Sequence, residues 1–153
     1  MIVTPGIIAC CCRFLDAIIE TIMGTHFGEH ITIDGYGGSP ERLNDEEAIS
    51  SALTELCDAL QMRPLMKPLI LSAPDNQLKD PGGWSAFVII AESHISIHTF
   101  PKRRFVSADI YTCQNGMDES LVVDFFKKKF QLEDVETNFI KRGTRYPAEN
   151  ISS

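Results

Sequence analysis

Three consecutive segments between residues 84 and 113 limit the fold most strongly, because each has the length and composition of a strand and the links between them are short. They read WSAFVII, SHISIHTF and RFVSADIYTC. Strands joined by such short links pair in antiparallel fashion, since a parallel pair needs a crossover of a dozen residues or more. The sequence therefore predicts an antiparallel sheet built around residues 84–113.

Other segments extend this sheet and cover it. A helix is expected where acids follow Asn44 or Asp45 and apolar residues recur at helical spacing until Arg63-Pro64 stops them. The expected strands are residues 29–38, 67–72 and 135–142, and the expected helices are residues 43–62 and 117–130. The order, in which helices interrupt a run of antiparallel strands, predicts an α+β two-layer sandwich with the helices packed on one face of the sheet.

The first 26 residues are treated separately from the folded domain, which is expected to comprise residues 27–153. Apolar residues at helical spacing within residues 13–23 predict an amphipathic helix, and an alternative is that Met23 is the biological start. Charged residues interrupt the apolar run before it could span a bilayer, and no basic leader precedes it. Neither a signal peptide nor a membrane helix is expected.

Charge and cysteine usage narrow the classes of partner. The net charge of −7 argues against a nucleic-acid binder, which usually presents a basic face. Cys10, Cys11 and Cys12 are consecutive, and the five cysteines contain neither a C-x-x-C pair nor the spread framework of a small secreted domain. A reducing cytoplasmic location and a small-molecule substrate are therefore expected.

The stretch AESHISIHTF, residues 91–100, contains most of the candidate functional residues. Strand alternation places His94, Ser96 and His98 on the same face of the expected strand. A solvated strand face would explain this pattern, and so would a metal site using His94 and His98, although a third ligand at a convincing spacing is missing. Nucleophilic chemistry using Ser93, His98 and Cys113 is the third explanation. Strict alternation puts Ser93 and His98 on opposite faces, so this explanation requires a bend near Ser93.

The strings AESHISIHTFP and SADIYTC closely resemble the short prokaryotic form of the S-adenosylmethionine decarboxylase family. The resemblance extends through HITIDGYGGSPERLNDEE and IKRGTRYP, covers residues 28–146, and leaves the leader unmatched. It implies a proenzyme that cuts itself between Glu92 and Ser93, giving a β chain of residues 1–92 and an α chain of residues 93–153. Ser93 would become a pyruvoyl group, which binds the substrate amine as a Schiff base and accepts electrons as carbon dioxide leaves.

Roles for other residues follow from the same resemblance. Ser85 and His98 match the residues that assist self-cleavage, and Cys113 matches the proton donor of decarboxylation. His94 and Ser96 are expected to line or support the site without a chemical step of their own. The family resemblance also implies a homodimer of cleaved protomers, with sites near the interface, that acts in spermidine biosynthesis.

The sequence departs from the family pattern where substrate is bound. Family members follow the processing histidine with Thr-Trp-Pro-Glu, whereas this chain has Thr99-Phe100-Pro101-Lys102. Phe100 can still stack on a base, but Lys102 cannot accept hydrogen bonds from a ribose diol. Trp84, in KDPGGWS, is a further candidate ring for substrate binding.

Two substrate classes therefore remain open. S-adenosylmethionine leads, and ornithine or arginine is the rival, with an acid among Asp34, Asp75 and Asp80 as a possible partner for a cationic side chain. Alternatives from other classes are a non-catalytic dimeric partner protein and a metal-binding protein. No metal is expected in the decarboxylase.

Overall fold

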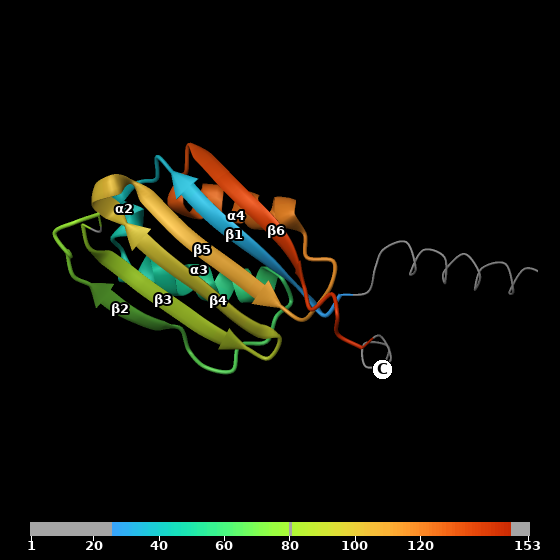
Figure 1. Cartoon of the computed structure of the whole chain (residues 1–153). Coiled ribbons are helices and arrows are strands. Elements are labelled where there is room, and N and C mark those ends of the chain that lie inside the picture. Colours follow the sequence, from blue (N-terminus) through green and yellow to red (C-terminus); the bar gives the residue numbers. More distant parts are fainter. Residues whose placement is uncertain (1–25, 80, 148–153) are drawn as a thin grey trace, which may run out of the picture.

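The computed structural model describes residues 26–79 and 81–147, and these form a six-stranded sheet covered by helices (Figure 1). Every pair of neighbouring strands is antiparallel. The order across the sheet is β2-β3-β4-β5-β1-β6, so the three strands predicted from residues 84–113 lie side by side. The strands are β1 (Gly28–Tyr36), β2 (Leu69–Ala73), β3 (Gly83–Ile90), β4 (Ser93–Phe100), β5 (Phe105–Thr112) and β6 (Asp134–Arg142).

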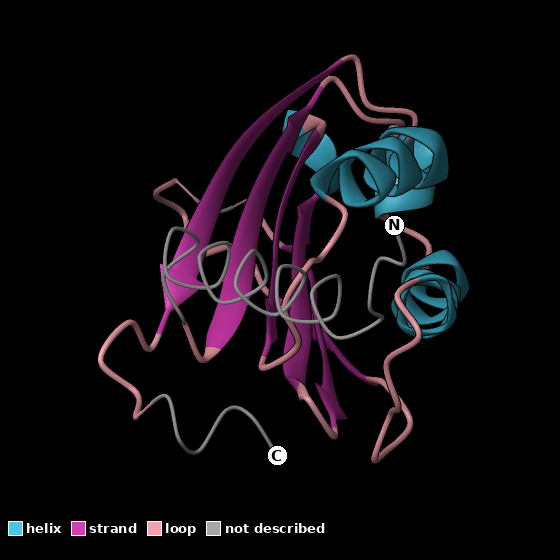
Figure 2. Cartoon of the chain, turned by 90° about the vertical axis from the view of Figure 1, so that its right-hand side faces the viewer, coloured by secondary structure: helices cyan, strands magenta, loops and turns pink. Residues whose placement is uncertain are grey.

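The long helices α3 (Glu46–Ala59) and α4 (Glu119–Phe130) pack on one face of the sheet and leave the other open (Figure 2). Their apolar stripes and the inward residues of the strands form one core, in which Phe126, Phe130 and Ile95 are fully buried. The predicted α+β two-layer sandwich is confirmed. The predictions for the first 26 residues, an amphipathic helix or a start at Met23, fall on residues 1–25, which lie outside those described. The expected domain boundary between residues 26 and 27 lies at the start of the described residues.

Capping residues set where the helices begin. Asp45 is the N-cap of α3 and accepts hydrogen bonds from the backbone N–H groups of Glu47 and Ala48 at 3.0 and 3.1 Å. The expected cap at Asn44 or Asp45 is thus confirmed at Asp45. Residues before it form a separate short helix, α2 (Pro40–Leu43), which was not predicted from the sequence. A single turn of 3-10 helix, η1 (Pro101–Arg103), joins β4 to β5.

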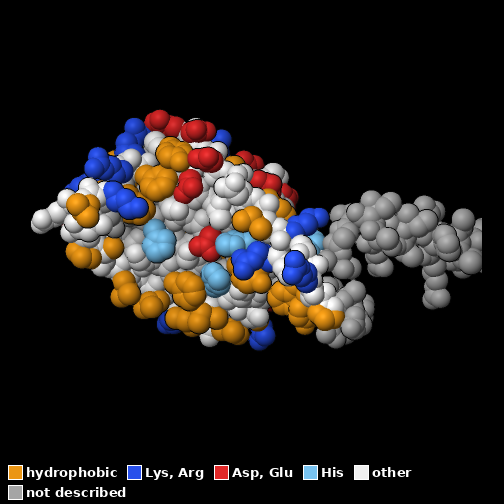
Figure 3. Space-filling view, viewed as in Figure 1, with side chains coloured by type: hydrophobic (Ala, Val, Ile, Leu, Met, Phe, Trp, Pro, Cys, Tyr) orange, Lys and Arg blue, Asp and Glu red, His pale blue; other side chains and the backbone are white. Residues whose placement is uncertain are grey.

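The open face of the sheet is partly apolar. Paired strand residues share a face, so the exposed Leu69 lies beside Phe87 and the exposed Ile89 lies beside His94. Figure 3 views this face and shows hydrophobic side chains gathered toward the β2–β3 edge, with histidines around an acidic group near the middle. Within the described part of the chain, none of the helices combines the length and the apolar composition needed to cross a bilayer.

Candidate active site

The predicted cleavage site lies in the tight turn between β3 and β4. Ser93 has a φ of +153°, a backbone angle that residues other than glycine seldom adopt and that stores strain. The Glu92 carbonyl oxygen, on the other side of the predicted scissile bond, accepts a hydrogen bond from the Cys113 backbone N–H at 2.9 Å. The Glu92 carboxylate accepts another from the Arg63 N–H at 3.0 Å. The turn is therefore held from two sides around a strained residue.

Sheet register brings Cys113 to this turn. Ser93 pairs with Thr112, the last residue of β5, so the next residue along the chain lies beside Glu92. The Cys113 thiol is free and exposed, as a proton donor to a substrate requires. The other described thiol, Cys57, is buried in the core, and burial raises its pKa, so that it remains an inert thiol.

The predicted processing residues Ser85 and His98 lie opposite each other on β3 and β4, with 3.0 Å between the Ser85 Oγ and the His98 Nδ1. They lie far from the Ser93 of the same chain. Five residues of strand correspond to about 16 Å at about 3.3 Å per residue. The predicted site residues therefore form two groups, here called half-sites, at opposite ends of β4, with Ser93 and Cys113 at one end and Ser85 and His98 at the other.

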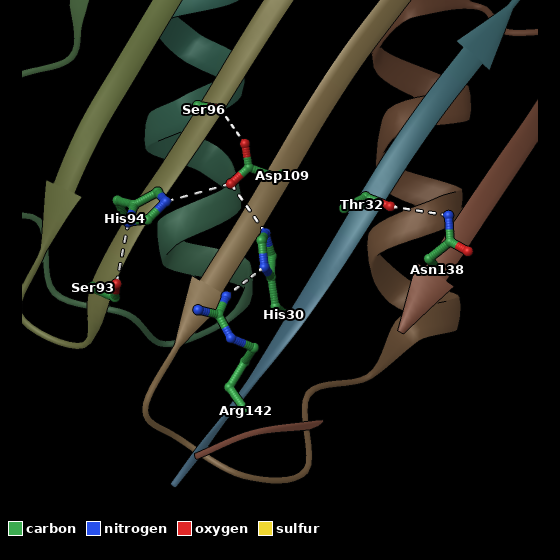
Figure 4. Close-up of polar contacts among 8 residues, drawn as sticks. All are labelled: His30, Thr32, Ser93, His94, Ser96, Asp109, Asn138 and Arg142. Atoms are coloured by element: carbon green, nitrogen blue, oxygen red, sulfur yellow. Dashed lines mark hydrogen bonds and ion pairs between the residues drawn. The ribbon is translucent and has the colours of Figure 1, made fainter. Parts of the chain in front are cut away.

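A polar network occupies the open face beside Ser93 (Figure 4). The Asp109 carboxylate lies 3.2 Å from His30 Nε2 and 3.4 Å from His94 Nε2, and it also accepts a hydrogen bond from the Ser96 hydroxyl. His94 Nδ1 lies 3.2 Å from the Ser93 Oγ. The network contains His94 and Ser96, which the sequence analysis expected to line the site.

Three members of this neighbourhood were not identified from the sequence. Asp109 belongs to the SADIYTC string, and His30 begins the alternating pattern of β1, so both lay within recognised segments. Arg142 ends β6, where its guanidinium lies 3.0 Å from His30 Nδ1 and over the Tyr111 ring. Alternation predicts that these side chains lie on one face, but only the register β4-β5-β1 makes them neighbours.

The loop that carries Cys113 is anchored by Glu29, a carboxylate only 5% exposed. Its Oε2 accepts hydrogen bonds from the backbone N–H groups of Gly116 and Met117 at 3.0 and 2.8 Å, and its Oε1 lies 3.1 Å from His26 Nε2. Burial alone raises the pKa of Glu29, but these hydrogen bonds together lower it below its usual value. Glu29 is therefore a charged anchor for this loop.

The predicted substrate-binding residues are divided between the two faces. Phe100 lies on the same face as His98, with its ring 5.4 Å from that of Phe105. Trp84 packs against the core on the helix side, where its indole N–H donates to the Asn44 carbonyl at 3.2 Å. Lys102 lies beyond the end of β4 and forms an exposed ion pair of 3.9 Å with Asp75.

The three candidate acids for a cationic side chain are also separated. Asp34 lines a shallow hollow on the open face with His98 and Asp109. Asp75 is engaged by Lys102, and Asp80 lies outside the described residues. In residues 26–79 and 81–147, no three histidine, cysteine or acidic side chains gather in a way that could hold a metal ion.

Fold and site together define an α+β sandwich with a strained serine in a hairpin turn and a free cysteine beside it. The model of the S-adenosylmethionine decarboxylase family matches residues 29–143. This chain belongs to that family.

Individual similar proteins agree with this family assignment. The chain is 34% identical to the S-adenosylmethionine decarboxylase proenzyme of Pyrobaculum islandicum over 112 residues, which cover 73% of this chain and 85% of the relative. It is 31% identical to that of Brevibacillus brevis over 117 residues, which cover 76% and 83%. The crystal structure of the Aquifex aeolicus adenosylmethionine decarboxylase shares the fold, with a TM-score of 0.66, 24% identity, and coverage of 78% of this chain and 92% of that one.

Proposed function

We propose that this protein is a self-processing, pyruvoyl-dependent decarboxylase whose substrate is S-adenosylmethionine. The observation that carries the proposal is the turn at Glu92 and Ser93, where a strained serine follows a carbonyl that already accepts the Cys113 N–H. Its product would serve as the aminopropyl donor of spermidine synthesis.

The residues at the turn suit self-cleavage. Attack of the Ser93 Oγ on the Glu92 carbonyl carbon moves negative charge onto an oxygen that the Cys113 N–H already contacts at 2.9 Å, the arrangement of an oxyanion hole. Cleavage of the C–N bond gives an ester. Loss of the Ser93 α-proton with departure of the Glu92 carboxylate, followed by hydrolysis that releases ammonia, leaves a pyruvoyl group on residue 93.

The same residues suit decarboxylation. A pyruvoyl group at position 93 supplies an electron acceptor for the electrons left behind by carbon dioxide. The exposed Cys113 thiol, one residue beyond the partner of Ser93 in the sheet, holds a proton for the substrate carbon. Phe100 presents a ring for stacking on the open face, and Trp84, on the helix side, does not share that face.

We further propose that the active form is a homodimer, because each chain separates its own half-sites along β4. A two-fold rotation that reverses β4 places Ser85 and His98 of one copy beside Ser93 of the other, and each interface contact occurs twice. The open face, with its exposed Phe87 and Ile89, supplies apolar area for such an interface. The Ser85–His98 pair would then assist self-cleavage in the neighbouring copy.

Ornithine or arginine is the alternative substrate, and two observations favour it. Lys102 replaces the carboxylate expected to bind the ribose and is paired with Asp75. The hollow beside His98 is lined by Asp34 and Asp109, whose carboxylates suit a cationic side chain. Carbon dioxide release measured in parallel with the three substrates decides between them. Activity confined to a basic amino acid would overturn S-adenosylmethionine as the substrate.

Self-cleavage is tested by intact-mass analysis of purified full-length protein. Two fragments corresponding to residues 1–92 and 93–153, the smaller with a blocked N-terminus, are expected, and the Ser93→Ala variant remains one chain. An uncleaved wild-type chain with an unmodified Ser93 contradicts the proposal and favours a non-catalytic dimeric partner. An uncleaved chain that binds stoichiometric zinc favours a metal-binding protein instead.

Coexpression of two variants with different tags tests the shared site. Ser93→Ala retains the Ser85–His98 pair, and His98→Ala retains Ser93. The His98→Ala chain stays intact alone and is cleaved when coexpressed with Ser93→Ala, because a mixed dimer combines the two intact half-sites. Cleavage of His98→Ala alone at the wild-type rate contradicts a role for His98, and no cleavage in the mixture contradicts a site shared between copies.

A further inference from the structure

The side chains of Ser93, His94 and Asp109 form a continuous chain of polar contacts on the open face (Figure 4). We propose that His94 is the base that removes the hydroxyl proton of Ser93 in self-cleavage and that Asp109 positions its imidazole. This inference rests on the proposed self-processing and assigns its first proton transfer. It also separates this step from any contribution of His98.

The contact between Ser93 and His94 depends on the strained backbone. Side chains of consecutive strand residues point to opposite faces, so a regular strand would separate these two. Ser93, at the first position of β4, has a φ of +153° that interrupts this alternation. Its Oγ lies 3.2 Å from His94 Nδ1, within reach of direct proton transfer.

Asp109 determines which imidazole nitrogen is available. An ionised carboxylate only accepts hydrogen bonds, so the His94 Nε2 that lies 3.4 Å from Asp109 carries the proton. The neutral ring therefore presents the lone pair of Nδ1 to the Ser93 hydroxyl. Hydrogen bonding of Asp109 to the Ser96 hydroxyl fixes the carboxylate from a second direction.

His30 and Arg142 hold the carboxylate from the other side. The Arg142 guanidinium can only donate, so the contact of 3.0 Å makes His30 Nδ1 an acceptor. His30 Nε2 then carries a proton and donates it to Asp109 at 3.2 Å. Asp109 is thus held by hydrogen bonds from His30 and Ser96 and faces His94 Nε2 at 3.4 Å, where it stabilises positive charge on His94 as it forms.

The step balances as an acyl transfer. The Ser93 Oγ–H bond breaks, its proton passes to His94 Nδ1, and a bond forms between Oγ and the Glu92 carbonyl carbon. The carbonyl oxygen takes the negative charge beside the Cys113 N–H. Collapse breaks the C–N bond, and the proton on His94 passes to the departing Ser93 nitrogen, giving an ester and a free amine.

His98 does not serve this step within the same chain. It lies five residues from Ser93 along β4, about 16 Å at about 3.3 Å per residue, and its Nδ1 contacts Ser85. Deprotonation of the hydroxyl and removal of the α-proton are separate proton transfers at different atoms. The structure thus provides one histidine in contact with Oγ and leaves a second histidine for a later step.

The test measures the rate of appearance of fragments 1–92 and 93–153 by mass spectrometry in freshly produced full-length protein, from acidic to neutral pH. His94→Gln, which cannot take the proton, slows cleavage by about 100-fold or more. Wild-type cleavage slows toward acidic pH because a protonated imidazole has no free lone pair, and the rate of His94→Gln loses this pH dependence. The titratable or charged groups around His94 are Asp109 and Tyr111 of β5, His30 of β1 and Arg142 of β6.

Further variants separate a chemical from a structural role. His30→Gln alters the surroundings of Asp109 without touching Ser93 and slows cleavage far less than His94→Gln. Asp109→Asn slows cleavage and shifts its pH profile, as expected of a positioning residue. Imidazole added to His94→Ala restores part of the rate. Ser93→Cys, whose thiol ionises more readily than a hydroxyl, makes cleavage less dependent on His94.

The results distinguish this inference from the proposed function. If the wild-type chain cleaves and folded His94→Gln cleaves equally fast, His94 is not the base and self-processing stands. If His94→Gln accumulates an ester that hydroxylamine cuts, His94 acts after the acyl transfer and the assignment is wrong. If the wild-type chain never cleaves, both proposals fail. Circular dichroism of each variant establishes that it is folded.

Discussion

Removal of the Glu29 carboxylate is expected to destabilise the loop that carries Cys113. In Glu29→Ala, the N–H groups of Gly116 and Met117 and the ring of His26 lose this acceptor. An unsatisfied buried donor costs about 1–3 kcal/mol. Water partly reaches this loop, so the lower part of the range applies to each of the two N–H groups, and a loss of about 2–3 kcal/mol in the free energy of unfolding is expected.

Glu29→Gln isolates the charge. A glutamine oxygen at the position of Oε2 still accepts both backbone N–H groups, but hydrogen bonds to a charged acceptor are stronger by about 1 kcal/mol each. Glu29→Gln is therefore expected to lose about 1–2 kcal/mol at pH 7. The lowered pKa of Glu29 also makes its contribution depend on pH.

The sign follows from linkage. Folding lowers the pKa of Glu29, so its stabilisation is fully present above the pKa of an unfolded glutamate, about 4.3, and is lost as the pH falls through the lower pKa of the folded chain. Glu29→Gln is therefore expected to lose less free energy of unfolding between pH 7 and acidic pH than its background does.

Urea unfolding followed by circular dichroism, at pH 7 and at several acidic values, measures both effects. A Ser93→Ala background keeps the chain in one piece. Glu46→Gln, an exposed residue at the start of α3, serves as the control and is expected to change stability by no more than about 0.5 kcal/mol. The reasoning is refuted if Glu29→Gln matches its background in both stability at pH 7 and acid sensitivity. In the otherwise wild-type chain, Glu29→Ala should also slow self-cleavage, because the loop no longer holds the Cys113 N–H against Glu92.

Three further substitutions test the fold and the turn. Ser93→Gly should be more stable than Ser93→Ala by about 1 kcal/mol or more, because a φ of +153° strains alanine and not glycine. Equal or reversed urea midpoints of the two variants would contradict this strain. Phe126→Ala should cost about 3–5 kcal/mol in the same assay, because the ring is fully buried, and a loss under about 1 kcal/mol would contradict that packing. Asp45→Ala should cost about 1 kcal/mol because α3 loses its N-cap, with the exposed Ser72→Ala as a control expected to be neutral.

The periodicity of apolar residues predicted most of the fold, because the pattern within each helix or strand depends on that element alone. The alternation around Ile31 and Ile33 and the helical stripe of α3 required no knowledge of their partners. The start of α3 was also predicted, because Asp45 was one of the two expected caps. The separate helix α2 was not predicted, since its four residues are too few to show a helical period, and Ser39 caps it through a hydrogen bond from the Arg42 N–H.

Predictions for the site were limited by distance along the sheet. The motif identified Ser93, His98, Ser85 and Cys113, and the sequence required a bend near Ser93 for it to meet His98. The structure has such a distortion, but a change of face does not shorten the strand between the two residues. Contact of His94 with Ser93 was not predicted because alternation forbids it in a regular strand.

The proposed cut after Glu92 would fall in the turn of the β3–β4 hairpin. Trp84 to Ile90 pair with Thr99 to Ser93, so a break after Glu92 leaves two polypeptides interleaved within one sheet and one core. Such a break leaves the strand pairing in place once the sheet has formed. After denaturation, however, two separate chains must associate where one chain had closed a local hairpin. If the chain cleaves itself as proposed, folding must therefore come first and the cut second. The cleaved protein, once denatured, should then refold at a rate that depends on protein concentration, whereas the uncut chain should not.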